Sequence, residues 1–221
     1  MENSSETRCE NCIIRKLNAL NALNKNELKR ISDSKVTKRV KKGESIFEEG
    51  EKLNGVFCVR SGVSKLSKLS ENGKDQIVKL VKKGELLGQR SVITEQSANL
   101  KAVALNDMEV CFIAKQEIST NIEGNIKFTK ELLLRIADDL KTSEDALVLL
   151  GQKTVSERLL ELFRYVKDNF GLDADGYLAI LLTREDMANI IGTAKEVTIR
   201  TISSLKKEGS IETDGKRIKL L

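Results

Sequence analysis

The sequence predicts an α+β protein with three successive parts: a strand-rich region, a long helix, and a group of short helices that ends in a hairpin. Three observations lead to this fold class. Short apolar segments separated by glycines fill residues 36–113, and leucine and isoleucine recur at helical spacing over residues 126–150. Two Thr-x-x-acid motifs then precede an Asp-Gly pair near the C-terminus. A chain of 221 residues is long enough to bury a substantial core.

The strand-rich region contains four apolar segments between glycine-containing turns. These predicted strands are residues 45–47, 55–59, 76–80 and 109–113. Short strands at this spacing favour a β-roll or a barrel. Ahead of them, residues 25–34 predict a helix that begins after Asn24, a residue suited to capping its first turn.

The long helix over residues 126–150 carries an apolar stripe with charged residues elsewhere. The stripe consists of Leu132, Leu133, Ile136, Leu140, Leu147 and Leu150. It can pack against a neighbouring domain of the same chain, or it can pair with its own copy in a two-fold dimer.

Two Thr-x-x-acid motifs predict the starts of two short helices, because the Thr hydroxyl and the acid cap each other's backbone amides. The motifs begin at Thr183 and Thr193, and Gly192 between them ends the first helix at Ile191. Two short helices joined by a tight turn form a helix-turn-helix. An ordinary αα-corner in a small core is the alternative.

The rest of the C-terminal region frames this helix pair. Residues 158–170 predict an amphipathic helix, and residues 177–180 predict a strand. Residues 211–218 predict a hairpin around Asp214-Gly215, which is a strong two-residue turn signal.

The second helix of the pair has the composition of a DNA-reading surface. Its predicted exposed arc holds Lys195, Glu196, Ile199, Arg200 and Ser203, and its predicted buried arc holds Ala194, Thr198, Ile202 and Leu205. Arginine can bind guanine, glutamate can accept from cytosine, and an apolar side chain can contact the thymine methyl group. Lys216, Arg217 and Lys219 would place the hairpin as a wing on the phosphate backbone. The candidate DNA-binding residues are Thr193, Lys195, Glu196, Ile199, Arg200, Ser203, Lys216 and Arg217.

The composition excludes several classes of protein. Without histidine there is no Ser-His-Asp or Cys-His machinery, no imidazole metal ligand and no His-bound haem. No phosphate-binding loop or paired-carboxylate motif stands out, so we expect no enzyme. The net charge of +5 is compatible with an anionic partner, while 4% aromatic residues argue against single-stranded nucleic acid.

Residues 1–8 are polar, and the chain contains no apolar run long enough to span a bilayer. We therefore expect a cytoplasmic protein that does not associate with membranes. In that compartment Cys-x-x-Cys pairs more often serve metal or redox chemistry than disulfides. The candidate metal ligands are Cys9, Cys12, Cys58 and Cys111.

The chain resembles the CRP/FNR family of transcription regulators nearly from end to end. The resemblance rests on Glu196-x-x-x-Arg200 after Gly192, and on residues 41–50 followed by residues 60–65, which are similar to the β-roll signature of the family. It implies a cyclic-nucleotide-binding-like β-roll, a long dimerisation helix and a C-terminal winged helix-turn-helix. It also implies a homodimer formed through the long helix, bound to a two-fold symmetric site in double-stranded DNA. RNA polymerase is a further partner that such a regulator could contact.

On this basis we predict four parts. They are an N-terminal cysteine segment at 1–19, a β-roll sensor at 20–125, a dimerisation helix at 126–150 and a DNA-binding domain at 151–221.

The resemblance also bears on the effector. Members that bind cyclic AMP carry Gly-Glu and Arg-Ser pairs where this chain has Gly88-Gln89 and Ala98-Asn99. Without the phosphate-binding arginine we expect no cyclic-nucleotide site, and a protein that is only a cyclic-nucleotide-binding module would leave residues 195–200 unexplained.

The cysteines resemble those of FNR-type members, which hold a [4Fe-4S] cluster on four cysteines. Cys9, Cys12 and Cys111 match three ligand positions, Asn18 stands at the fourth, and Cys58 restores the number of thiols to four. A cluster, a thiol switch, a zinc site and purely structural cysteines remain open. We expect a DNA-binding regulator that responds to oxygen or redox state through a cluster or thiols. The alternative is a regulator with a vestigial effector pocket and structural cysteines.

Overall fold

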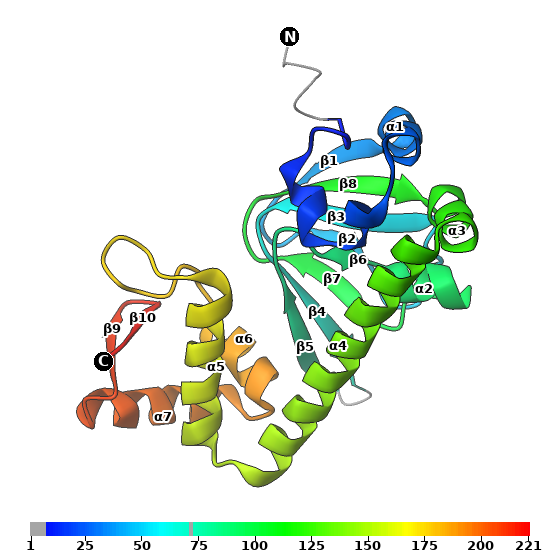
Figure 1. Cartoon of the computed structure of the whole chain (residues 1–221). Helices are drawn as coiled ribbons and strands as arrows, with labels where there is room; N and C mark the ends of the chain where they lie inside the picture. Colours follow the sequence, from blue (N-terminus) through cyan, green and yellow to red (C-terminus); the bar gives the residue numbers. More distant parts are fainter. Residues whose placement is uncertain (1–7, 71–72) are drawn as a thin grey trace. The chain divides into compact units, whose positions relative to one another are not determined.

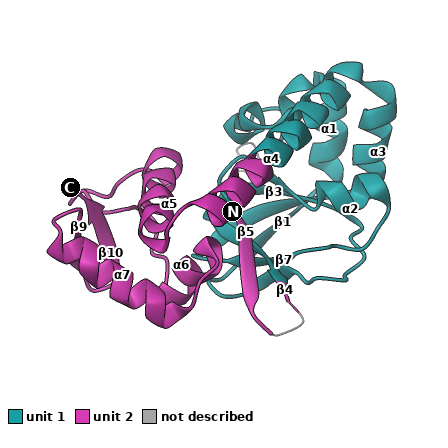
Figure 2. Cartoon of the chain, turned by 90° about the horizontal axis from the view of Figure 1, so that it is seen from below, with its two compact units in different colours: residues 1–68, 80–141 teal, residues 69–79, 142–221 magenta. Residues whose placement is uncertain are grey.

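The computed structural model describes residues 8–70 and 73–221, and the chain folds into two compact units (Figure 2). Unit 1 comprises Met1–Lys68 and Leu80–Lys141, and unit 2 comprises Leu69–Lys79 and Thr142–Leu221. Residues 1–7 of the predicted cysteine segment lie outside the described residues.

Eight strands of the described residues form a β-roll of two antiparallel sheets, with orders β1-β8-β3-β6 and β2-β7-β4-β5 (Figure 1). The strands are β1 (Val36–Val40), β2 (Ser45–Phe47), β3 (Gly55–Ser61), β4 (Ser64–Leu69), β5 (Asp75–Val81), β6 (Leu86–Leu87), β7 (Lys101–Ala104) and β8 (Met108–Ala114). The four predicted strand segments fall within β2, β3, β5 and β8. Phe47, Phe57, Val59 and Val110 belong to one buried cluster contributed by both sheets.

Short helices accompany the roll. They are the 3-10 helices η1 (Ile13–Leu17) and η2 (Ala19–Ala22), followed by α1 (Lys25–Ser34), α2 (Gln89–Thr94) and α3 (Lys115–Gly124). Helix α1 has its predicted bounds, and Asn24 caps it: its Oδ1 accepts from the amides of Asn26 and Glu27 at 2.9 and 3.0 Å. A second core cluster joins these helices to strands β3 and β8.

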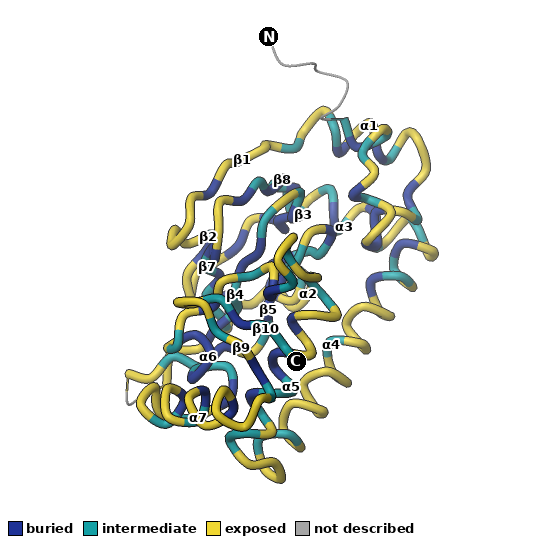
Figure 3. Tube along the Cα trace, turned by 90° about the vertical axis from the view of Figure 1, so that its left-hand side faces the viewer, coloured by how far each residue is buried: buried dark blue, intermediate teal, exposed yellow. Residues whose placement is uncertain are grey.

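Helix α4 (Ile126–Gln152) is the long helix that the apolar stripe predicts. Phe128 and Leu132 near its start are buried. Beyond them the helix is mostly exposed, as Figure 3 shows, and Leu133, Leu140 and Leu147 are 65%, 61% and 70% exposed. Most of the apolar stripe is therefore exposed to solvent in the single chain that the structure describes.

Unit 2 contains three further helices and a hairpin. These are α5 (Val155–Phe170), α6 (Arg184–Ile191), α7 (Lys195–Lys207), β9 (Ile211–Asp214) and β10 (Arg217–Leu220). Helix α5 starts three residues before its predicted start, because Thr154 and Glu157 form a capping box. Leu159, Phe163, Ile191, Leu205 and Ile218 are among the buried side chains of the unit.

The predicted strand at residues 177–180 is wrong. Only an isolated bridge joins Leu172 to Leu178 there among the described residues. The amide of Leu178 donates to the carbonyl of Ile218 at 2.8 Å, whereas the next amide, of Ala179, donates to Gly171 at 3.1 Å. Successive amides therefore turn to different partners, and no ladder develops.

The structure confirms the predicted α+β architecture of β-roll, long helix and winged helix-turn-helix. In the part of the chain that the structure describes, no helix is both long enough and apolar enough to cross a membrane.

Candidate nucleic-acid interface and cysteine core

Helices α6 and α7 form the predicted helix-turn-helix. Thr183 Oγ1 accepts from the amide of Asp186 at 3.0 Å, and Asp186 Oδ2 accepts from the amide of Thr183 at 3.1 Å, which completes a capping box. Gly192 ends α6 with φ +65°, a left-handed conformation that favours glycine. Both the start and the stop of α6 follow the sequence signals.

The start of α7 differs from the prediction. Its N-cap is Ala194, and no side chain caps its first turn, so the predicted capping box at Thr193 is wrong. The amide of Thr193 instead donates to the carbonyl of Ala188 at 3.1 Å, within the end of α6. Thr193 therefore belongs to the C-terminal cap of α6, and Ala194 is exposed rather than buried.

The exposed side of α7 carries the predicted arc, which we call the recognition face: Lys195, Glu196, Ile199, Arg200 and Ser203. Thr198, Ile202 and Leu205 are buried on the opposite side. Ile199 is 44% exposed, an unusual position for isoleucine among charged neighbours. Arg200 makes no ion pair with any residue that the structure describes, whereas Lys195 Nζ lies 3.7 Å from Glu185.

The hairpin β9–β10 forms the predicted wing, with its turn one residue later than expected. Asp214 pairs with Arg217, so Gly215 and Lys216 make the turn. Gly215 has φ +55°, which satisfies the positive φ that such tight hairpin turns require. Lys216 is exposed at the tip.

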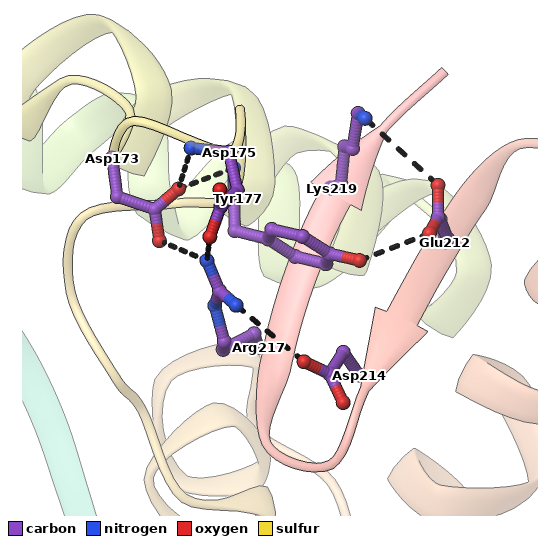
Figure 4. Close-up of polar contacts among 7 residues, drawn as sticks. All are labelled: Asp173, Asp175, Tyr177, Glu212, Asp214, Arg217 and Lys219. Carbon is purple, nitrogen blue, oxygen red and sulfur yellow. Dashed lines mark hydrogen bonds and ion pairs between the residues drawn. The ribbon is translucent and has the colours of Figure 1, made fainter.

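Arg217 is engaged within unit 2 (Figure 4). One terminal nitrogen lies 2.9 Å from Asp173 and 2.6 Å from Asp175, and the other lies 3.4 Å from Asp214. Its guanidinium carbon lies 4.1 Å from the ring centroid of Tyr177. Hydrogen bonds to Asp175 and Asp173 raise the pKa of Arg217, and the hydrogen bond from Arg217 lowers the pKa of Asp173.

The four cysteines belong to, or pack against, one apolar cluster, which we call the cysteine core. Cys58 on β3 and Cys111 on β8 are directly opposite each other in the antiparallel register. Cys9 is buried in the same apolar cluster, and Cys12 packs against it half-buried. The sequence did not reveal that Cys58 and Cys111 are neighbours, because they are 53 residues apart.

Asn18 ties the N-terminal segment to this core. Its Oδ1 accepts from the amide of Leu20 at 2.9 Å, and its Nδ2 donates to the carbonyl of Gly84 at 2.9 Å and to Cys58 Sγ at 3.4 Å. Asn18 is buried. Its amide therefore lies at hydrogen-bonding distance from the one cysteine that departs from the FNR-type pattern.

The thiols differ in their surroundings. Burial raises the pKa of Cys58 to about 12, with repulsion from Cys111 and Cys12 adding to it. Burial also raises the pKa of Cys9, which the charge of Lys35 partly offsets. Lys35 Nζ and Thr37 Oγ1 lie 3.9 and 3.7 Å from Cys111 Sγ. The spacing of cysteines in the sequence does not reveal these two neighbours, because they lie 76 and 74 residues before Cys111.

As a donor set, four thiols suit an iron–sulfur cluster. In the structure, however, the described residues contain no group of three or more Cys, Asp or Glu side chains close enough together to hold a metal ion, so the cysteines are not gathered into a formed metal site.

The residues that the family resemblance compares with a cyclic-AMP site lie at the start of α2 and just before β7. Gly88 begins α2 with φ +82°, and a Cβ there would lie 2.8 Å from Leu53. Ala98 is buried where an arginine would be needed, and Asn99 is exposed. Arg90 is also exposed.

Comparison with known protein families matches both halves of the chain. Residues 37–125 match a cyclic nucleotide-binding domain, and residues 155–221 match a Crp-like helix-turn-helix domain. The first match identifies the β-roll of unit 1 as this kind of domain, and the second covers the winged helix-turn-helix.

Full-length relatives agree with these matches. Electron transport regulator A of Shewanella oneidensis is 30% identical over 95% of this chain and 85% of its own length. The anaerobic regulatory protein of Haemophilus influenzae is 27% identical over 95% and 82%. The solved structure of FixK2 from Bradyrhizobium japonicum is 26% identical, with a TM-score of 0.75 over 84% of this chain and 92% of that one. The chain is therefore a member of the CRP/FNR family, whose members are DNA-binding transcription regulators and not enzymes.

Proposed function

We propose that this protein binds a specific, two-fold symmetric site in duplex DNA as a homodimer, and that its cysteine core makes this binding respond to oxygen or redox state. It would act in the cytoplasm, where such a regulator meets its DNA. The observation that carries the DNA-binding part is the recognition face, on which an exposed isoleucine stands among exposed polar and charged side chains.

Each side chain of the recognition face has a role that suits the major groove. Arg200 would take guanine through two parallel hydrogen bonds, Glu196 would accept from cytosine, and Ile199 would contact a thymine methyl group. Lys195 and Ser203 flank them, and Thr193 lies in the turn before α7 begins. The uncapped first turn of α7 leaves backbone amides that suit a phosphate, and Lys216 at the wing tip suits another.

Helix α4 supports the homodimer. Members of the family typically dimerise, and the exposed leucines of α4 form an apolar stripe that a second copy would cover. A two-fold dimer would place two recognition faces in successive major grooves, which explains a symmetric site.

The DNA contacts can be tested on a site that the protein itself selects. Wild-type protein would enrich its operator from a random duplex library, and binding would then be measured on operators with single base-pair changes. Arg200→Ala should cost about 1–3 kcal/mol of binding free energy and relax the preference at one base pair in each half-site. Unchanged affinity and preference in that variant would refute the assignment of α7.

The cysteine core supports the sensing part. Three segments far apart in sequence place four thiols in or against one apolar cluster, and relatives include proteins named as anaerobic regulators. An iron–sulfur cluster held there would supply an oxygen-reactive redox centre. Cys9 and Cys12 would hold it from the N-terminal segment, and Cys58 and Cys111 from the β-roll.

The contact between Asn18 and Cys58 supports Cys58 as the replacement for the ligand that Asn18 cannot supply. Asn18 occupies the position of a ligand, but its oxygen already accepts from Leu20 and its nitrogen faces Cys58 Sγ at 3.4 Å. The thiol of Cys58 therefore lies next to the side chain of Asn18, the residue that stands where the FNR-type pattern has a cysteine ligand. The fourth ligand would come from β3 instead of from the N-terminal segment.

A ligand exchange tests this arrangement. Anaerobically purified wild-type protein should contain iron and sulfide, Cys58→Ser should lose most of both, and adding Asn18→Cys to Cys58→Ser should restore them. Asn18→Cys alone is the matched control and should keep the wild-type content. Full iron content in Cys58→Ser, or no recovery in the double variant, would refute the role of Cys58.

A second candidate is a regulator whose cysteines are only structural. The burial of Cys9, Cys58 and Cys111 in an apolar cluster favours it, because buried free cysteine commonly behaves as a small hydrophobic residue. In that case, anaerobic wild-type protein would contain no iron and would still bind its operator.

A further inference from the structure

We propose that Arg217 is a positioning residue that fixes the wing against the loop between α5 and α6, and that Lys216 beside it makes the wing's contact with DNA phosphate. The two basic residues are neighbours in sequence, and the sequence predicts the same role for both. The structure places them in different surroundings, because Lys216 is exposed at the turn and Arg217 lies within a network of carboxylates.

The loop offers Arg217 a preformed acceptor. Asp173 Oδ1 accepts from the amides of Asp175 and Tyr177 at 3.1 and 2.9 Å, so this carboxylate closes the turn of its own loop. Its other oxygen, Oδ2, accepts from Arg217 at 2.9 Å. Arg217 is therefore bound to a carboxylate whose orientation the loop backbone already determines (Figure 4).

Further contacts complete the attachment. Tyr177 is buried, lies against the guanidinium of Arg217, and donates its hydroxyl hydrogen to Glu212 on β9 at 2.9 Å. The amide of Leu178 donates to Ile218 on β10. Both strands of the wing are thus connected to the loop. One terminal nitrogen of Arg217 donates to Asp173 and Asp175 of the loop, and the other donates to Asp214 on β9.

The local charge argues against a phosphate at Arg217. Asp173, Asp175 and Asp214 contact it, and the neighbouring Glu212 is paired with Lys219 at 3.9 Å. A phosphate that approached Arg217 would meet three carboxylates, and one terminal nitrogen of the arginine already donates to both Asp173 and Asp175. Lys216 is exposed and makes no ion pair with any residue that the structure describes.

The salt dependence of DNA binding separates the two roles, because each phosphate contact contributes about 0.9 to the slope of log affinity against log salt on duplex DNA. The assay is fluorescence anisotropy of the selected operator and of an unrelated duplex, at several salt concentrations. Lys216→Gln should lower the slope by about two, because the homodimer loses one phosphate contact in each half, and should weaken both duplexes alike. Arg217→Gln should keep the slope and the affinity for the unrelated duplex, while the preference for the operator falls severalfold.

A second set of variants shows whether Arg217 acts through the loop. Asp175 is 68% exposed, so Asp175→Asn should leave the fold intact while weakening the attachment. Its preference for the operator should fall less than that of Arg217→Gln, and combining both changes should be no worse than Arg217→Gln alone. Arg217→Lys should recover part of the preference, since one ammonium can replace only part of the planar fork.

The opposite results would overturn the proposal. A slope that falls by about two in Arg217→Gln, with both duplexes weakened alike, would make Arg217 a phosphate contact in each half of the dimer. An unchanged operator preference in both Arg217→Gln and Asp175→Asn would show that the attachment has no role in binding. Failure of Lys216→Gln and Arg200→Ala to affect binding would instead refute the proposed DNA surface itself, on which the role of Arg217 depends.

Discussion

The cysteine core of unit 1 and the recognition face of unit 2 present their functional side chains in opposite ways. In the cysteine core, Cys9, Cys58 and Cys111 are buried and held by contacts between distant segments. On the recognition face, the five side chains point to solvent from one helix whose buried side fixes its position. A side chain that must meet a partner can be exchanged without harming the fold, whereas one that senses from inside a core is also part of that core.

The largest difference between the regions should appear in stability. Asn18→Ala would leave the amide of Leu20 and the carbonyl of Gly84 without their buried partner, at about 1–3 kcal/mol of unfolding free energy. Arg200→Ala should change the unfolding free energy by less than about 0.5 kcal/mol, because it is an exposed residue without an ion pair among those described. Urea unfolding of both variants measures the two changes in unfolding free energy. Equal losses of stability in the two variants would contradict this difference between the regions.

A smaller effect should distinguish the two threonines of the helix-turn-helix. Thr183 caps α6, so Thr183→Ala should cost about 1 kcal/mol of unfolding free energy. Thr193 caps nothing with its side chain at the start of α7, and Thr193→Ala should stay within about 0.5 kcal/mol. Urea midpoints of the pair would decide between this structure and the sequence prediction, which expects equal losses.

These two threonines also show how far local sequence patterns reach. Thr183 and Asn24 are capping residues that a motif identifies, because all partners lie within three or four positions. Thr193 has the same motif, but its amide is used by the end of α6, an effect of the preceding helix. The prediction of a strand at residues 177–180 is wrong for a related reason. The amide of Leu178 donates to Ile218 in the wing, whereas the amide of Ala179 donates to Gly171 in the same loop.

The site residues divide along the same line. The helical period alone predicted the exposure of the recognition face, whereas the partners of Arg217 lie 42 and 44 residues away in the loop. Asn18 and Cys58 are 40 residues apart. No spacing rule connects such pairs, because the β-roll and the packing of the loop bring them together.

The smallest expected effect concerns access to the thiols in protein without metal. Cys12 is half-buried, while the other three are buried, and burial raises the pKa of Cys58 to about 12. Because the thiolate is the reactive form, iodoacetamide at neutral pH should label Cys12 first and Cys58 last. Mass spectrometry of peptides sampled over time gives the order. Early labelling of Cys58 would show that the cysteine core opens readily, and the contrast between the regions would weaken.

If the cysteine core senses oxygen and the recognition face binds DNA, a change at the first must alter affinity at the second. The comparison that shows this directly is the operator affinity of anaerobically prepared protein before and after exposure to air, for wild type and Cys58→Ser. Typical coupling between two sites predicts a change of about 5- to 150-fold in the wild type, and none in Cys58→Ser. A wild-type affinity that air leaves unchanged, or an equal response in Cys58→Ser, would contradict this coupling.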